Sequence, residues 1–217
     1  MNRERLSNLQ EKKEFLSDWE KDFLESLVVQ FDKKGTLSER QIGVVNLLEE
    51  KTSPEAIAER NEWETNYKQS EREKAIVVAK YYKETGYFRS LADSILDNPE
   101  FVPEKRSYKK MAENKYALRV LAEYFGAPKY PNGSLVMLRA GADYHLKRAA
   151  GDNYCVVIAS GKSVGVSSSA AKGAKLYKIL PFGSSKVYTV EERHLKKARK
   201  SKTTKKVKKD LDNEDLF

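Results

Sequence analysis

A chain of 217 residues, of which 40% are hydrophobic and 34% charged, is long enough for one large domain or two small ones with a strongly polar surface. Its net charge of +9 indicates a polyanionic partner, and its single cysteine, Cys155, excludes an intrachain disulfide and a cysteine-based zinc site. No stretch has the length of a signal-peptide core or of a membrane span. We therefore expect no membrane association and a cytoplasmic location, or a nuclear one if the source is eukaryotic.

Residues 6–125 have the apolar spacing of helices. Apolar side chains recur every three or four positions over residues 16–31, and Gly35 fits the position that follows a helix end. Ser38 with Gln41 predicts a capping box at the start of the next helix.

Ser53 predicts the N-cap of a long helical stretch that ends near Gly86. Its middle, residues 59–74, is almost entirely polar, so one long helix with an exposed middle and two helices with a break both fit. We expect a further helix capped by Ser90 and, after it, one amphipathic helix over residues 104–126.

The hydrophobic period changes after this helix, where Pro128, Pro131 and Gly133 mark a boundary. Short β-rich runs follow, as in a small antiparallel barrel or sandwich, namely SLVMLRA, NYCVVIAS, GVSSS, AKLYKILPF and KVYTVEE. The segment EERHLKKA predicts a terminal helical turn. The expected fold class is α+β, with an all-α helical domain at residues 1–127, a small antiparallel β-barrel at residues 132–198 and a disordered charged tail at residues 199–217.

The motif SGKSVG is similar to the end of a phosphate-binding loop, but Val156 stands where such a loop needs its first glycine. A tight hairpin turn at Gly161 explains these residues. His145 and His194 have no cysteine or second histidine at ligand spacing, so we expect no metal site and no cofactor. No nucleophile-elbow motif is present, and we expect no enzymatic activity; a Ser–His–Asp arrangement assembled from distant positions stays the alternative.

Cations and tyrosines share the β-rich part of the chain, and Asp143 and Asp152 are the only acids between residues 124 and 190. Lys and Arg side chains pair with the phosphates of a nucleic-acid backbone, and tyrosine rings stack on unpaired bases. The combination of the two residue types therefore indicates a nucleic-acid-binding surface. The alternative is a basic barrel whose tyrosines bridge core and surface. The candidate binding residues here are Arg139, Lys147, Arg148 and Lys162, interleaved with Tyr144, Tyr154, Tyr177 and Tyr188.

Residues 132–198 resemble the SH3-like barrels of nucleic-acid-associated proteins. The opening GSLVMLRA is similar to their first strand, and VYTVEERHLKKA is similar to their last strand and closing turn. Such barrels bind RNA, DNA, peptides or methylated tails, so the resemblance does not by itself assign a function. The helical segments FLESLVVQFDKKGTLSERQ and GYFRSLADSIL resemble modules of phage-encoded accessory proteins.

The end of the chain is divided by charge. Residues 193–209 carry +10 and residues 210–217 carry −4, which leaves +3 for residues 1–192. We expect the cations to hold nucleic acid through its phosphates, although an inert tail that aids solubility and a nuclear localisation signal have the same composition. These cations are Lys196, Lys197, Arg199, Lys200, Lys202, Lys205, Lys206, Lys208 and Lys209.

The last residues, DLDNEDLF, are similar to two kinds of docking tail. Single-stranded DNA-binding proteins of bacteria and phages end in acids and a Phe that docks replication partners, and some sliding-clamp-binding peptides end in acids, Leu and Phe. The proline usual in the first kind and the glutamine usual in the second are missing, so both identifications stay open. We expect a replication or transcription protein to bind Leu211, Leu216 and Phe217.

These features together predict a non-enzymatic DNA-binding accessory protein of replication, recombination or transcription, of the kind that phages encode. The alternatives are an RNA-binding or ribosome-associated protein and an interaction adaptor that uses the barrel to bind a peptide.

Overall fold

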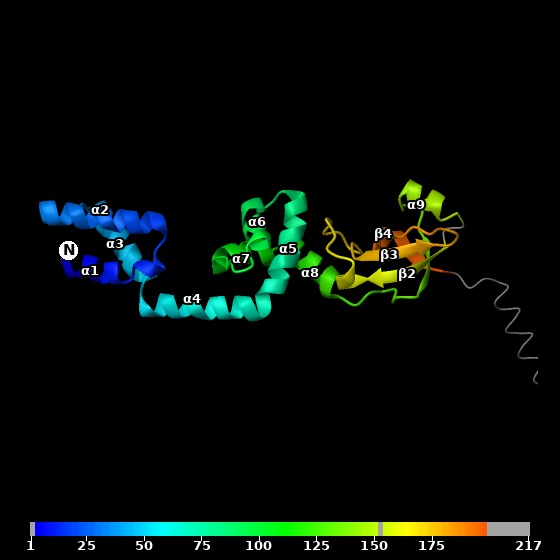
Figure 1. Ribbon diagram of the computed structural model, residues 1–217, viewed down its shortest axis with the longest axis horizontal. Helices are drawn as coiled ribbons and strands as arrows, with labels where there is room; N and C mark the ends of the chain where they lie inside the picture. Colours follow the sequence, from blue (N-terminus) through cyan, green and yellow to red (C-terminus); the bar gives the residue numbers. More distant parts are fainter. Residues whose placement is uncertain (1–2, 152–153, 199–217) are drawn as a thin grey trace, which may run out of the picture. The chain divides into compact units, whose positions relative to one another are not determined.

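The computed structural model describes residues 3–151 and 154–198, and these form an α+β protein, as the sequence predicts (Figure 1). The chain divides into two compact units, unit 1 (Met1–Ser70) and unit 2 (Glu71–Phe217). Each unit is described by itself.

Unit 1 is helical, with α1 (Arg3–Glu11), a 3₁₀ turn η1 (Lys13–Phe15), α2 (Asp18–Lys34), α3 (Glu39–Lys51) and α4 (Pro54–Asn66). The capping box expected at Ser38 and Gln41 is confirmed, and Ser17 with Glu20 forms a second one at the start of α2. Gly35 ends α2 with φ at 70°, as expected. Buried leucines from α1, α2 and α3 form the core of this unit.

The long helical stretch after Ser53 continues without a loop. Ser53 caps α4, as expected, and a π-helical segment η2 (Tyr67–Glu71) leads into α5 (Arg72–Thr85). Within the polar stretch, Trp63 and Tyr67 are buried, so its middle is not uniformly exposed. The boundary between the two units falls inside this π-helical segment.

In unit 2, α5 contacts α6 (Arg89–Asp97), α7 (Lys105–Ala112) and α8 (Lys115–Phe125). The N-cap expected at Ser90 is wrong, because the N-cap of α6 is Phe88, two residues earlier. Phe88 makes this start possible by taking a left-handed backbone conformation with φ at 51°. No helix of the described residues is long and apolar enough to cross a bilayer.

The single helix expected over residues 104–126 is also wrong, because Asn114 divides it into α7 and α8. The side-chain amide of Asn114 donates to the carbonyls of Lys110 (3.0 Å) and Met111 (2.8 Å) at the end of α7. Its side-chain oxygen accepts from the backbone N–H groups of Tyr116 and Ala117 at the start of α8. One side chain thus satisfies backbone groups of both helices and holds a two-residue turn.

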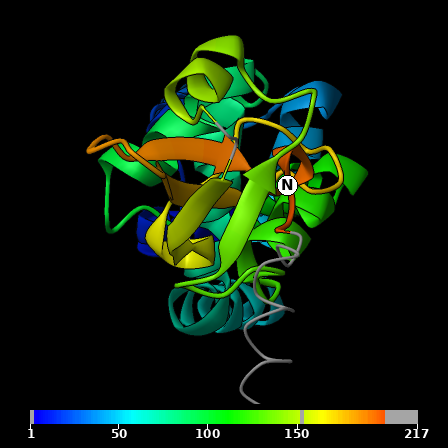
Figure 2. The same cartoon turned by 90° about the vertical axis from the view of Figure 1, so that its right-hand side faces the viewer.

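The sheet of unit 2 is antiparallel and has the strand order β4-β3-β2-β1-β5 (Figure 2). Its strands are β1 (Leu135–Leu138), β2 (Tyr154–Ser160), β3 (Leu176–Pro181), β4 (Tyr188–Glu191) and β5 (Leu195–Lys197). No ladder joins β4 to β5 among the described residues, so the sheet is open and these two strands are its edges.

Two expectations for this region need correction. The run GVSSS is not a strand but part of the connection from β2 to β3, where the Ser167 hydroxyl accepts from the backbone of Ser169 (3.1 Å) and donates to Glu191. Such local bonds compete with a strand ladder. The turn expected near the end is present as the 3₁₀ turn η4 (Glu192–His194), but it is followed by β5, which pairs with β1.

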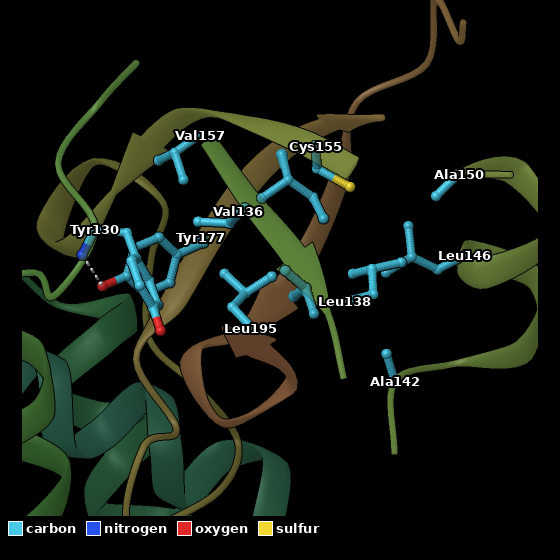
Figure 3. Packing of buried hydrophobic residues seen from close by; sticks show 12 residues of the cluster. Tyr130, Val136, Leu138, Ala142, Leu146, Ala150, Cys155, Val157, Tyr177 and Leu195 are labelled. Atoms are coloured by element: carbon cyan, nitrogen blue, oxygen red, sulfur yellow. Dashed lines mark hydrogen bonds between the residues drawn. The ribbon is translucent and has the colours of Figure 1, made fainter. Parts of the chain in front are cut away.

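The core of the sheet is closed at one end by α9 (Tyr144–Ala149), which lies in the connection between β1 and β2. Figure 3 shows Leu146 and Ala150 directed toward Leu138. Alternation along β1 buries Val136 and Leu138. Cys155 is buried in this core, and burial raises the pKa of its thiol to about 11.

Buried polar contacts connect α8 and the segment after it with the sheet. Lys175 is only 6% exposed, and its Nζ donates to the carbonyls of Glu123 and, at 2.6 Å, Gly126 at the end of α8. The hydroxyl of Tyr177 accepts from the backbone N–H of Lys129 at 2.9 Å. Helices α5 to α8 therefore share one compact unit with the sheet. Independent folding of residues 132–198 stays a prediction.

Candidate nucleic-acid interface

One edge of the sheet collects most of the predicted binding residues that the structure describes. We call it the basic edge and define it as Arg139, Lys147, Arg148, Lys196 and Lys197. The β1–β5 ladder sets Met137 opposite Lys196 and Val136 opposite Lys197. Lys196 is half-buried, and Lys197, the last residue of β5, is exposed although alternation places it on the same face as buried Leu195.

Arg139 follows β1 and is held against β5. Its backbone N–H donates to the carbonyl of His194 and its Nε donates to the carbonyl of Leu195, both at 2.8 Å. These contacts use only part of the guanidinium. Its two terminal nitrogens have no hydrogen bond or ion pair with the described residues, and they can serve an external acceptor.

The short helix α9 places Lys147 beside Arg139, and Arg148 follows Lys147 in the same helix. The carboxylate of Asp143 accepts from the N–H of Leu146 (3.0 Å) and caps the helix, while the Leu146 side chain anchors it in the core. Nζ of Lys147 donates to the carbonyl of Ala140 (2.8 Å), next to Arg139 in the chain. Arg148 is exposed and has no acidic partner among the described residues.

Two acids that follow one another at the end of β4, Glu191 and Glu192, are engaged away from this edge, whereas Asp143 lies on it and is used to cap α9. Glu191 accepts from Ser167 (3.1 Å) and pairs with Arg193, and Glu192 accepts from the hydroxyl of Tyr177 (2.7 Å). Burial, with the Glu192 carboxylate, raises the pKa of the Tyr177 hydroxyl, so it remains a neutral donor. Glu191 and Glu192 therefore do not neutralise the positive charge of the basic edge.

Lys162 lies apart from the basic edge. It belongs to the 3₁₀ turn η3 (Gly161–Ser163), which begins with φ of Gly161 at 67°. The tight hairpin expected at Gly161 is wrong, because residues 161–175 form a long connection between β2 and β3. Nζ of Lys162 pairs with Glu73 of α5 at 2.8 Å and lies 4.4 Å from the ring centre of Phe125 at the end of α8. The Lys162 ammonium is thus paired within unit 2, where it connects η3 with α5 and α8.

The tyrosines expected to stack on bases differ in exposure. Tyr177 is fully buried and cannot contact a base, whereas Tyr154 and Tyr188 are half-buried. Tyr144 is 66% exposed at the start of α9, with its ring 5.7 Å from that of His145. Of these four rings, only that of Tyr144 is largely open to solvent beside the basic edge.

The remaining predicted residues lie outside the described part of the chain. They are the cations Arg199, Lys200, Lys202, Lys205, Lys206, Lys208 and Lys209 and the docking residues Leu211, Leu216 and Phe217. Over residues 3–151 and 154–198, no three His, Cys, Asp or Glu side chains gather closely enough to hold a metal ion.

No known protein family, no curated protein and no solved structure matches this chain. A functional conclusion therefore depends on the residues of the chain itself.

Proposed function

We propose that the protein is a non-enzymatic DNA-binding accessory protein that holds phosphates along the basic edge and the Lys/Arg run that follows it. The observation that carries this proposal is the position of β5. It is an edge strand of two lysines and a leucine, and the chain continues from it into seven further Lys and Arg by residue 209. A polyanion bound at the edge can therefore contact both sets of cations.

We further infer that the sheet is curled in the manner of an SH3-like barrel. In a flat sheet, β4 and β5 would lie about 19 Å apart, at about 4.8 Å for each neighbouring pair. The 3₁₀ turn η4 is the whole connection between them, and a turn of this length spans roughly 8 Å. This mismatch supports a sheet bent until its two edges approach each other, with β5 at the seam.

Neutralising β5 tests the basic edge. In Lys196→Gln/Lys197→Gln, affinity for fluorescein-labelled DNA should fall roughly tenfold at about 0.1 M salt, and the log–log salt slope should decrease by about 1.5, as expected for two lost phosphate contacts. The measurement is a fluorescence-anisotropy titration at two salt concentrations. The matched control, Lys178→Gln/Lys186→Gln, removes the same charge from β3 and the β3–β4 turn.

Equal losses in both double variants would mean that net charge, not the edge, determines binding. Titration with RNA of the same length decides between the two nucleic acids. Tighter binding of RNA would favour the RNA-binding alternative, and binding of neither would favour an interaction adaptor.

We also propose that Leu211, Leu216 and Phe217 dock a replication or transcription protein. A buried aromatic anchor supplies most of the affinity of such a contact, while the surrounding acids mainly speed encounter. Phe217→Ala should therefore abolish capture of the partner from host lysate and leave DNA affinity within about twofold of wild type. Recovery of the same proteins by both baits would contradict this role.

A further inference from the structure

A second surface of unit 2 combines exposed aromatic rings with cations and shares no residue with the basic edge. Tyr87 and Phe88, in the turn between α5 and α6, are 72% and 40% exposed. Tyr116, in the first turn of α8, is 48% exposed. Large aromatic side chains exposed together mark interaction sites more often than single exposed apolar residues do.

Phe88 and Tyr116 are both connected to the buried Tyr82, the first by ring contact and the second through Asn114. The ring of Tyr82 is 5.1 Å from that of Phe88 and 4.9 Å from that of Tyr81. The Tyr82 hydroxyl exchanges hydrogen bonds of 2.8 and 3.0 Å with the side chain of Asn114, which also accepts from the N–H of Tyr116. Burial raises the pKa of both buried hydroxyls, and the nearby Tyr116 adds to the shift of each. Both exposed aromatic residues are therefore connected to one buried side chain, Tyr82.

The backbone of Phe88 gives a second indication. Its φ of 51° lies in the left-handed region, where non-glycine residues are uncommon, and it is the only such residue in the described part of the chain. Gly86, two positions earlier, already ends α5 with φ at 81°. Strained backbone of this kind is found most often at functional sites. Here it holds an aromatic ring that remains partly open to solvent.

Cations gather in sequence around Tyr116, where Asn114 joins the end of α7 to the start of α8. Residues 105–119 contain six Lys and Arg and one acid, Glu113. Nζ of Lys115 lies 5.1 Å from the ring centre of Tyr116. Among the described residues, no ion pair engages the exposed cations of this turn, which are Lys109, Lys110, Lys115 and Arg119.

We infer that this surface, the aromatic shelf (Tyr87, Phe88, Tyr116, Lys115 and Arg119), binds single-stranded nucleic acid by stacking unpaired bases. Rings with open faces take bases of any sequence, and neighbouring cations hold the phosphates between them. A duplex keeps its base faces covered, so it would engage the cations without the rings. A single strand is the ligand that uses both halves of the surface.

The inference rests on the proposed function in one respect, that the ligand is a nucleic acid. It does not depend on the basic edge, because the shelf is a separate surface. The shelf lies at the start of α8, whereas Lys175 connects the sheet to its end. The 11 residues of α8 separate these points by about 16 Å.

The test compares the binding of two oligonucleotides of equal charge, an oligothymidylate of about 20 nucleotides and an abasic strand of the same length. This length exceeds the roughly 4–16 nucleotides that a single-strand binding site covers. The full chain should bind the oligothymidylate at least about fivefold more tightly, since stacking depends on the bases. In Phe88→Leu/Tyr116→Leu, which keeps apolar bulk and removes the ring faces, this ratio should fall to within about twofold of unity with abasic affinity unchanged. Phe182→Leu, an exposed phenylalanine of the β3–β4 turn, should keep the wild-type ratio.

Ultraviolet crosslinking of the wild-type chain to oligothymidylate gives a readout that does not depend on the folding of a variant. Adducts are expected on the peptides that carry Tyr87, Phe88 or Tyr116. Equal affinity of the wild type for both oligonucleotides, a ratio that persists in the double variant, or adducts confined to Tyr144 would overturn the inference and leave the proposed function standing. Binding of neither oligonucleotide would overturn both.

Discussion

Deletion of residues 199–217 is expected to lower affinity for DNA roughly 100-fold at about 0.1 M salt and to flatten its salt dependence. The deletion removes seven Lys and Arg together with four Asp and Glu. Each phosphate contact contributes about −0.7 to −0.9 to the slope of log affinity against log salt, so seven contacts account for a change of about 5 to 6. Anisotropy titrations of the full and shortened chains at several salt concentrations measure both quantities.

The control is deletion of residues 210–217 alone, which removes the acids and leaves the cations. This variant should bind DNA more tightly than the wild type, because the acids no longer compete with phosphates for the lysines. Binding that remains after the larger deletion should fall further in Lys147→Ala/Arg148→Ala, which belongs to the basic edge. Unchanged affinity and slope after the larger deletion would show that the tail makes no phosphate contacts.

Replacement of Lys175 by Met is expected to lower the free energy of unfolding of unit 2 by about 2–3 kcal/mol. Met keeps most of the buried apolar stem but removes the charged donor to the carbonyls of Glu123 and Gly126. Those carbonyls end α8, where a cation also interacts favourably with the helix dipole. Denaturant unfolding followed by circular dichroism measures the loss. Lys172→Met, at an exposed position in the same connection, should change stability by less than about 0.5 kcal/mol.

Amide hydrogen exchange on Lys175→Met also tests how unit 2 folds. If α8 and β3 lose protection together, the helices and the sheet form one cooperative unit. If only α8 loses protection, residues 132–198 fold by themselves, as the change of hydrophobic period predicts. A loss of stability as small as that of Lys172→Met would mean that the buried ammonium contributes little.

The sequence by itself determined the features that depend on a few neighbouring residues. The capping box at Ser38 and the helix end at Gly35 follow from local hydrogen bonds and from a backbone angle that glycine favours. The change from helical to strand periodicity predicted the α+β class, because it reflects which side chains face a core. Local patterns did not predict helix ends that depend on a residue distant in the sequence. Asn114, supported by Tyr82, divides what the period alone predicts as one helix.

Only the tertiary structure decided which cations are available to a ligand. In the sequence, Lys162, Lys175 and Lys197 are equivalent members of a basic segment. In the fold, Lys162 is paired with Glu73, Lys175 is buried against the end of α8, and Lys197 is exposed on an edge strand. The pairing of β5 with β1 and the connection of Phe88 and Tyr116 to Tyr82 likewise join segments far apart in the chain. Such contacts depend on how the elements pack, and neither composition nor periodicity records them.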